Sequence, residues 1–202
     1  MRDRKNRVEY LGVTGEMGAG KDTFCQFLKD QYSNVFVFRF SDILTEILKF
    51  FFNSIKREDQ QWLGKLLKER FGGDILVKSL IRKSKQIPGG LVVFNGVRSE
   101  EEERAIRLNN GKIIYITAKR RLRWERIQKR GEKEDDKASY QKFLEMEKAP
   151  TELSIPLIGK RADFKLENNY SKRNLFKKIK ELISKNYGKK LLPRKVCCNR
   201  RD

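Results

Sequence analysis

Short apolar stretches alternate with longer stretches of helical periodicity along most of the chain. The short stretches are rich in β-branched and aromatic residues, which favours strands. These predicted strands cover residues 8–14, 34–40, 91–95, 112–117 and 163–167. The predicted helices cover residues 21–32, 41–55, 57–71, 73–86, 99–109, 119–130, 138–148 and 171–186. Short strands separated by helices predict an α/β fold with a parallel sheet covered on both faces.

The first predicted strand runs into a glycine-rich turn that ends in Gly20-Lys21-Asp22-Thr23. Glycines at 15, 18 and 20 permit positive φ angles, so successive backbone N–H groups can face one anion. The helix that follows adds the positive end of its dipole, and Lys21 can reach the β- and γ-phosphates of a nucleotide. We therefore predict a phosphate-binding loop. Its residues are Gly15, Glu16, Met17, Gly18, Ala19, Gly20, Lys21, Asp22 and Thr23.

The bare pattern G-x4-G-K is a weak signal in a chain this rich in lysine. The preceding strand and the following helix supply the context that the motif requires. A glycine-rich turn that binds nothing is the alternative interpretation.

Asp22 stands where such a loop usually carries the Ser or Thr that ligates Mg²⁺. Its carboxylate either holds the ion, directly or through water, or only favours the helix N-terminus. Thr23 would bind on the side of the α-phosphate. Asp22 and Thr23 are therefore the candidate metal residues, and both interpretations of Asp22 stay open on the sequence.

Two segments interrupt the alternation of strands and helices. The helical stretch at 41–90 is far longer than a crossover connection needs, which predicts an inserted region that binds a phosphoryl acceptor. The polar segment at 130–139 lies between two helices and predicts a mobile lid. We expect one domain over 1–188 and a flexible basic tail at 189–202.

Arginines are placed where they could bind phosphate. Arg98 follows the predicted strand that ends at Asn95, at the sheet edge where open α/β folds bind ligands. It either clamps an acceptor phosphate or is a surface arginine neutralised by the acidic run at 100–103. Arg126 and Arg130 share a helix face towards the predicted lid and could stabilise transferring charge, or form an exposed basic face.

The second predicted strand ends in Arg39-Phe40-Ser41-Asp42. Arg39 could hold the acceptor phosphate. Asp42 is either a general base that faces the acceptor or an N-terminal helix cap, a role for which Ser41 competes. Trp62 is interpreted as part of the core of the inserted helices, with base stacking as the alternative.

Composition narrows the chemistry. The 202 residues carry a formal net charge of +20, which indicates either a solvated basic surface or a weak contact with nucleic acid or another polyanion. The chain has no His and its three Cys lack paired spacing, so we expect neither a zinc site nor disulfides. No apolar run approaches the ~20 residues that span a bilayer, and we expect a cytoplasmic protein without a membrane partner.

Six segments, in order, resemble the nucleoside monophosphate kinase group of P-loop kinases, specifically its deoxynucleoside monophosphate kinase and dephospho-CoA kinase-like branches. The similarity covers residues 8–186, and Asn168 stands in a segment that in dephospho-CoA kinases lies near the donor adenine. The segments are GVTGEMGAGKDT, FRFSDILTEIL, REDQQWLGKLLKERFGGDIL, VVFNGVRSEEE, ERIQKRGEKEDD and RADFKLENN.

This resemblance implies a five-stranded parallel sheet with a helical acceptor region and a lid. It implies ATP and Mg²⁺, with residues 15–23 on the phosphates, Arg98 and Arg39 on the acceptor, and Arg126 and Arg130 on the transition state. We expect transfer of the γ-phosphoryl group of ATP to a (deoxy)nucleoside monophosphate. Dephospho-CoA is the alternative acceptor, and an ATP-binding protein that holds nucleic acid without a small acceptor is the alternative class.

Overall fold

A computed structural model describes residues 8–131, 139–188 and 190–194. Its strands form one five-stranded sheet in the order β2-β3-β1-β4-β5, and every neighbouring pair is parallel. The strands are β1 (Val8–Thr14), β2 (Val35–Arg39), β3 (Gly90–Asn95), β4 (Lys112–Thr117) and β5 (Phe164–Glu167). The sheet confirms the predicted α/β class and its parallel topology.

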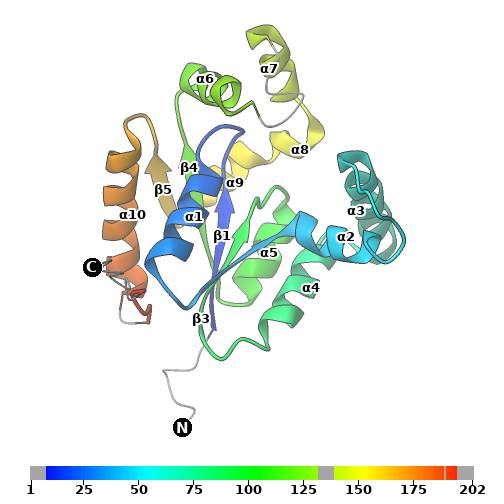
Figure 1. Cartoon of the computed structure of the whole chain (residues 1–202), viewed down its shortest axis with the longest axis horizontal. Helices are drawn as coiled ribbons and strands as arrows, with labels where there is room; N and C mark the ends of the chain where they lie inside the picture. Colours follow the sequence, from blue (N-terminus) through cyan, green and yellow to red (C-terminus); the bar gives the residue numbers. More distant parts are fainter. Residues whose placement is uncertain (1–7, 132–138, 189, 195–202) are drawn as a thin grey trace, which may run out of the picture.

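Helices cover both faces of this sheet (Figure 1). They are α1 (Lys21–Gln31), α2 (Phe40–Leu48), α3 (Arg57–Phe71), α4 (Ile75–Ser84), α5 (Glu100–Leu108), α6 (Arg120–Arg130), α7 (Tyr140–Met146), α8 (Pro150–Leu153), α9 (Ile155–Arg161) and α10 (Lys172–Tyr187). Among the described residues, none of them is long and apolar enough to cross a bilayer.

Alternate residues of each central strand face opposite layers of the core. Leu11 and Val13 of β1 pack with α1 and α10 on one face. Gly12 faces the other layer, where a Cβ atom would meet Ile113 Cδ1 at 2.6 Å and Ile106 Cδ1 at 3.0 Å. That second layer contains α4, α5 and α9. Because both faces are covered, the strands are apolar runs, as the sequence showed.

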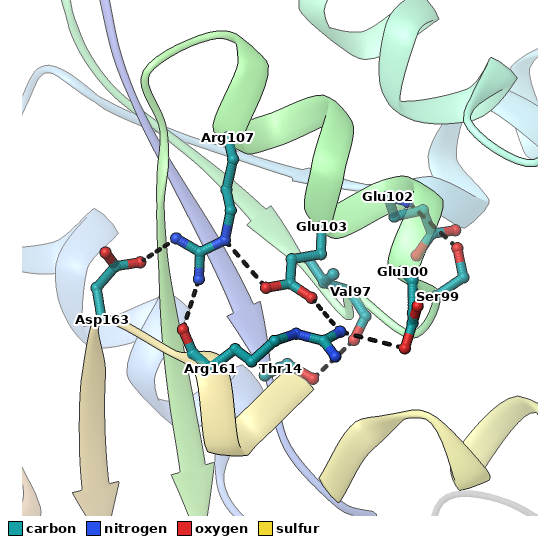
Figure 2. A network of polar contacts seen from close by, with 9 residues as sticks. All are labelled: Thr14, Val97, Ser99, Glu100, Glu102, Glu103, Arg107, Arg161 and Asp163. Carbon is teal, nitrogen blue, oxygen red and sulfur yellow. Dashed lines mark hydrogen bonds and ion pairs between the residues drawn. The ribbon is translucent and has the colours of Figure 1, made fainter. Parts of the chain in front are cut away.

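Polar contacts fix α9 and β5 against α5 (Figure 2). Glu103 is buried and accepts hydrogen bonds from Arg107 Nε at 3.0 Å and Arg161 Nη2 at 2.8 Å. Arg107 also reaches Asp163 Oδ2 at 2.9 Å, and the same oxygen accepts from the backbone N–H of Ile113 at 2.8 Å. This cluster, which we call the α5–α9 network, orients the segments that flank the sheet on this side.

The inserted region is a separate small helical layer. Leu44 and Leu48 of α2 pack against Leu63 of α3 and Leu76 of α4. The predicted helix at 41–55 is too long, because α2 ends at Leu48. Its continuation would carry the three phenylalanines 50–52, which are 86%, 74% and 53% exposed and so have no buried face to support another helical turn.

Two helices were not predicted. The periodicity predicts no helix over the segment that contains α8 and α9, although Pro150 and Pro156 stand in their first turns, where proline is favoured. Helices α6 and α7 are connected by aromatic contacts, since Trp124 meets Tyr140 edge-on at 5.5 Å between ring centroids. Most of the predicted lid, residues 132–138, lies outside the described residues.

The segment 190–194, expected to belong to a flexible tail, is packed instead. Leu191 is buried among residues of α1 and α10. The backbone N–H of Leu192 donates to Asn34 Oδ1 at 2.8 Å, and Pro193 bridges Tyr32. The many basic residues around Leu191 made this segment look like a flexible tail in the sequence, although Leu191 packs into the core. Residues 195–202 lie outside the described part of the chain.

Candidate functional site

The glycine-rich loop lies between β1 and α1, at the carboxyl edge of the sheet. Connections from the neighbouring strands leave in opposite directions here, which is where open α/β sheets bind ligands. Gly15, Gly18 and Gly20 have φ angles of 150°, 74° and 105°. A Cβ atom would lie 2.1 Å from Ile116 O at Gly15 and 2.5 Å from Arg123 O at Gly18. Only glycine therefore fits the cradle.

Lys21 lies folded over this loop. Its Nζ donates to the carbonyl oxygens of Gly15 at 2.6 Å and Glu16 at 3.0 Å. Desolvation and, to a smaller extent, the nearby charge of Arg98 together lower the pKa of Lys21 from 10.5 to about 8. The carboxylates of Glu152, Asp22 and Glu16 offset this lowering only in part, and among the described residues the ammonium itself is held by neutral carbonyls. An anion bound in the loop would supply the missing negative charge.

The other loop residues support its shape. Glu16 Oε1 accepts hydrogen bonds from the hydroxyls of Tyr115 and Thr117 of β4. Desolvation and this bond to Glu16 raise the pKa of Tyr115 to about 12, so the phenol stays a donor. The Met17 carbonyl accepts from Arg123 at 3.2 Å, and Ala19 is completely buried. The predicted loop is therefore anchored to β4 and α6.

Asp22 projects from the first turn of α1 towards β2 and β3. Its Oδ1 accepts from Asn95 Nδ2 at 2.8 Å and from Arg39 Nη2 at 3.1 Å. The carboxylate is 65% exposed, so oxygen lone pairs face solvent beside the loop. Carboxylate and hydroxyl oxygens suit Mg²⁺, and Asp22 and Thr23 fit such an ion. Within the described ranges, no group of three or more acidic or Cys side chains forms a closed metal site.

A cavity of about 430 Å³ opens next to the loop, and we call it the donor pocket. It brings together most of the predicted phosphate-side residues from three separate parts of the chain: the loop with the start of α1, helix α6, and the end of β5. These lining residues are Gly18, Gly20, Lys21, Asp22, Thr23, Arg126, Arg130 and Asn168. Sequence reasoning missed Tyr170, Lys172 and Leu175, which also line it. All three lie within seven positions after Asn168, so the predicted role of Asn168 near the donor could have indicated them.

Arg126 is poised for an anion. Its Nη2 donates to the Asn168 carbonyl at 2.9 Å, whereas its Nη1 is buried and has no hydrogen-bond partner among the described residues. A buried guanidinium nitrogen without a partner is costly, so this donor position fits a phosphate oxygen. Asn168 also donates from Nδ2 to the Ala19 carbonyl at 2.9 Å, which ties the end of β5 to the loop.

Arg123, on the same helix α6 as Arg126 and Arg130, has a different role. Arg123 is buried, and its Nε donates to the Ala118 carbonyl at 3.0 Å. Its Nη1 pairs with Glu147 Oε1 at 2.5 Å. Arg123 therefore braces α6 against the segment after α7, while Arg126 and Arg130 line the donor pocket.

Arg98 is paired with a residue that the sequence did not indicate. Its Nη1 forms an ion pair with Glu152 of α8, a carboxylate that is 8% exposed. The backbone N–H of Arg98 donates to Glu102 Oε2 at 2.9 Å. In the alternative interpretation, residues 100–103 neutralise Arg98. The structure shows their contact only with its backbone N–H, and its guanidinium pairs with Glu152 of α8 instead. The Pro150 helix start was the signal that could have revealed Glu152.

Asp42 takes part in the N-terminal cap of α2. The N-cap residue is Arg39, and Asp42, in the first turn of the helix, accepts the Arg39 backbone N–H through Oδ2 at 3.1 Å. The capping alternative therefore describes the contact of Asp42, although neither Asp42 nor Ser41 is the N-cap residue itself. Trp62 is 59% exposed, so its expected place in the core is wrong. Cys25, beneath the loop, is buried, and desolvation raises the pKa of its thiol to about 12, which excludes it as a nucleophile.

The fold and this loop define a P-loop α/β protein with a kinase-like architecture. A family model described as an AAA domain matches residues 11–149, more than half of the chain. The chain belongs to this AAA-domain family.

Several curated archaeal proteins are similar over nearly their whole length. A UPF0200 protein from Sulfurisphaera tokodaii is 27% identical over 179 residues, which covers 88% of this chain and 97% of that protein. A UPF0200 protein from Hyperthermus butylicus is 25% identical over 177 residues, with 87% and 94% covered. Their names state no activity.

Solved structures share the fold. TT1252 from Thermus thermophilus has a TM-score of 0.59 at 19% identity, covering 90% of this chain and 100% of that one. A tunicamycin resistance protein from Deinococcus radiodurans has a TM-score of 0.56 at 13% identity, covering 94% and 100%. Shikimate kinase from Acinetobacter baumannii, solved with shikimate, has a TM-score of 0.52 at 18% identity, covering 90% and 96%. At these identities the likeness concerns the fold alone.

Proposed function

We propose that this protein is an ATP-dependent phosphotransferase that passes the γ-phosphoryl group to a small nucleotide-like acceptor. A (deoxy)nucleoside monophosphate is the first candidate acceptor and dephospho-CoA the second. The observation that carries the proposal is the buried Arg126 Nη1, which has no partner among the described residues and lies beside a glycine cradle of the phosphate-loop type.

On the donor side, the loop N–H groups and Lys21 would hold the β- and γ-phosphates. Arg126 and Arg130 would contact the transferring group from α6, on the same pocket wall. Arginine stabilises the charge that spreads over the three equatorial oxygens as transfer proceeds. When bound, Mg²⁺ would neutralise phosphate charge near Asp22 and Thr23.

On the acceptor side, Arg39 and Arg98 stand beyond Lys21, at the ends of β2 and β3. Arg39 pairs with Asp22, and Arg98 pairs with Glu152. An acceptor phosphate would compete with these carboxylates for the two guanidinium groups. An oxygen of the acceptor then attacks the γ-phosphorus, the bond to the bridging oxygen breaks, and ADP carries that electron pair away. This chemistry depends mainly on positioning, and Asp42 would serve as base only if α2 uncapped.

The test is an assay of ADP release with nucleoside monophosphates and dephospho-CoA in parallel, with the phosphorylated product identified by mass. Lys21→Ala should abolish transfer to the detected acceptor while the melting temperature stays near that of the wild type. Lys29→Ala, on the exposed end of the same helix, is the matched control and should leave turnover unchanged. Wild-type turnover in Lys21→Ala, or no product from any acceptor, would refute the proposal.

A further inference from the structure

A second, larger cavity lies on the outer side of the α1 and α10 layer. It has a volume of about 820 Å³ and lies between these two helices. We call it the α1–α10 groove. Its cationic wall consists of Lys172, Arg173, Lys177 and Lys180. Lys172 also lines the donor pocket, so the groove begins where that pocket ends.

The four cations are exposed, and none forms an ion pair with an acidic side chain in the part of the chain that the structure describes. Two of them lie over aromatic rings: Lys172 is 5.5 Å from the Phe176 ring centroid and Lys180 is 6.0 Å from that of Phe27. The acidic members of the groove, Asp30 and Glu181, leave a net charge of +2 there, from four cations and two anions.

This arrangement differs from that of the basic residues in the α5–α9 network. In the α5–α9 network, Arg107 and Arg161 each contact two carboxylates (Figure 2). Surface charges that serve stability are organised in such ion-pair networks. Cations that repel each other along one groove cost stability unless an external anion binds them, so the groove needs a different explanation.

The geometry of the helix suits an extended anion. Arg173, Lys177 and Lys180 stand at i, i+4 and i+7, on one face of α10 over about 10 Å of helix axis. The two phenylalanine rings stack on each other at 4.4 Å between centroids and carry lysines, so they form a wall and leave little ring face for a base. The groove can therefore read phosphates and not base edges.

We propose that the α1–α10 groove binds the phosphodiester backbone of a nucleic acid without sequence preference. This site is separate from phosphoryl transfer and does not depend on the function proposed above. The net charge of +20 would strengthen long-range attraction, while the groove would provide the contacts.

The test is fluorescence anisotropy of the full chain with a labelled 20-nucleotide single-stranded RNA and with a duplex DNA, over a range of salt concentrations. Each phosphate contact contributes about 0.7–0.9 to the slope of log K against log salt. Lys177→Ala combined with Lys180→Ala should therefore lower the slope by about 1.5 and weaken binding about 30-fold at 0.1 M salt.

Arg82→Ala combined with Lys85→Ala is the matched control. These two residues are exposed at the end of α4, on the opposite face of the sheet, and their removal changes the net charge equally. The control should retain nearly wild-type affinity and slope. Equal weakening by both double variants would assign binding to overall charge and overturn the proposal, as would absence of binding at 0.1 M salt. Lys21→Ala should keep its affinity for the nucleic acid, which separates this site from the donor pocket.

Discussion

At the scale of single residues, Lys21 links phosphate binding to protonation. Its pKa, lowered to about 8 by desolvation and then by Arg98, should rise when phosphates place negative charge beside it. At pH 8.5 the binding of ATP should therefore take up protons, and affinity should fall as the pH rises above about 8.

Calorimetry in two buffers of different ionisation enthalpy measures this uptake directly. Lys21→Arg stays protonated throughout and should show no buffer dependence beyond that of ATP itself. Equal binding heats for the wild type in the two buffers, after correction for ATP, would contradict the prediction. The unfolded chain binds more protons at this residue between pH 8 and 10.5, so Lys21 alone makes stability rise with pH in that window.

Gly18 should tolerate a methyl group less well than another left-handed glycine. Gly18 and Gly131 have φ angles of 74° and 61°, but a Cβ atom meets Arg123 O at 2.5 Å in the first case and nothing within 4 Å in the second. Gly131→Ala should cost about 1–2 kcal/mol of unfolding free energy. Gly18→Ala should cost about 1–3 kcal/mol more and weaken nucleotide binding, as urea titrations with and without ATP will show. Equal costs would mean that the Arg123 carbonyl of α6 moves aside freely.

Residues that belong to one continuous motif were predictable, and residues supplied by the fold were not. The loop glycines and Lys21 follow each other in sequence, and Arg126 shares a helical spacing with Arg130. Glu152, in contrast, pairs with Arg98, which lies 54 positions away, and the sequence around Glu152 does not indicate this partner. Distant pairing depends on how α8 is placed against the sheet, which periodicity does not encode.

At the scale of secondary structure, the α5–α9 network should hold the sheet edge more firmly than its exposed charges suggest. Glu103 is buried with two arginine partners, so Glu103→Gln removes charge-assisted hydrogen bonds and should cost about 1–3 kcal/mol. Glu100→Gln removes only the exposed ion pair with Arg161 and should change stability little. Thermal and urea unfolding measure the loss of stability in both variants. Equal losses would contradict the prediction that the buried Glu103 carboxylate contributes more than the exposed Glu100 carboxylate.

The elements themselves were predicted best where burial and pattern agree. The range expected for the helix at 57–71 matches α3 in full, and the strand expected at 112–117 matches β4. The helix expected at 41–55 overran α2 because apolar residues count equally in a pattern whether they are buried or exposed. Phe50 is the clearest case, at 86% exposure.

At the scale of the whole molecule, a net charge of +20 should destabilise the compact state by self-repulsion. Salt screens this repulsion, with a Debye length that falls from about 10 Å at 0.1 M to about 3 Å at 1 M. The melting temperature should therefore rise when NaCl is increased from about 0.05 M to about 0.5 M. KCl at equal ionic strength should give the same rise. A fall in both salts would mean that ion pairs such as those of Arg161 outweigh the repulsion.

The edge-on contact between Trp124 and Tyr140 has an optical consequence. The chain has two tryptophans, and the other, Trp62, is exposed on the inserted helix α3. Replacing Trp62 with Phe would leave one indole, between α6 and α7, with Arg121 4.6 Å from its ring. Its emission intensity would then follow the spacing of these two helices in real time, so the protein carries its own unlabelled fluorescent reporter next to Arg126 and Arg130.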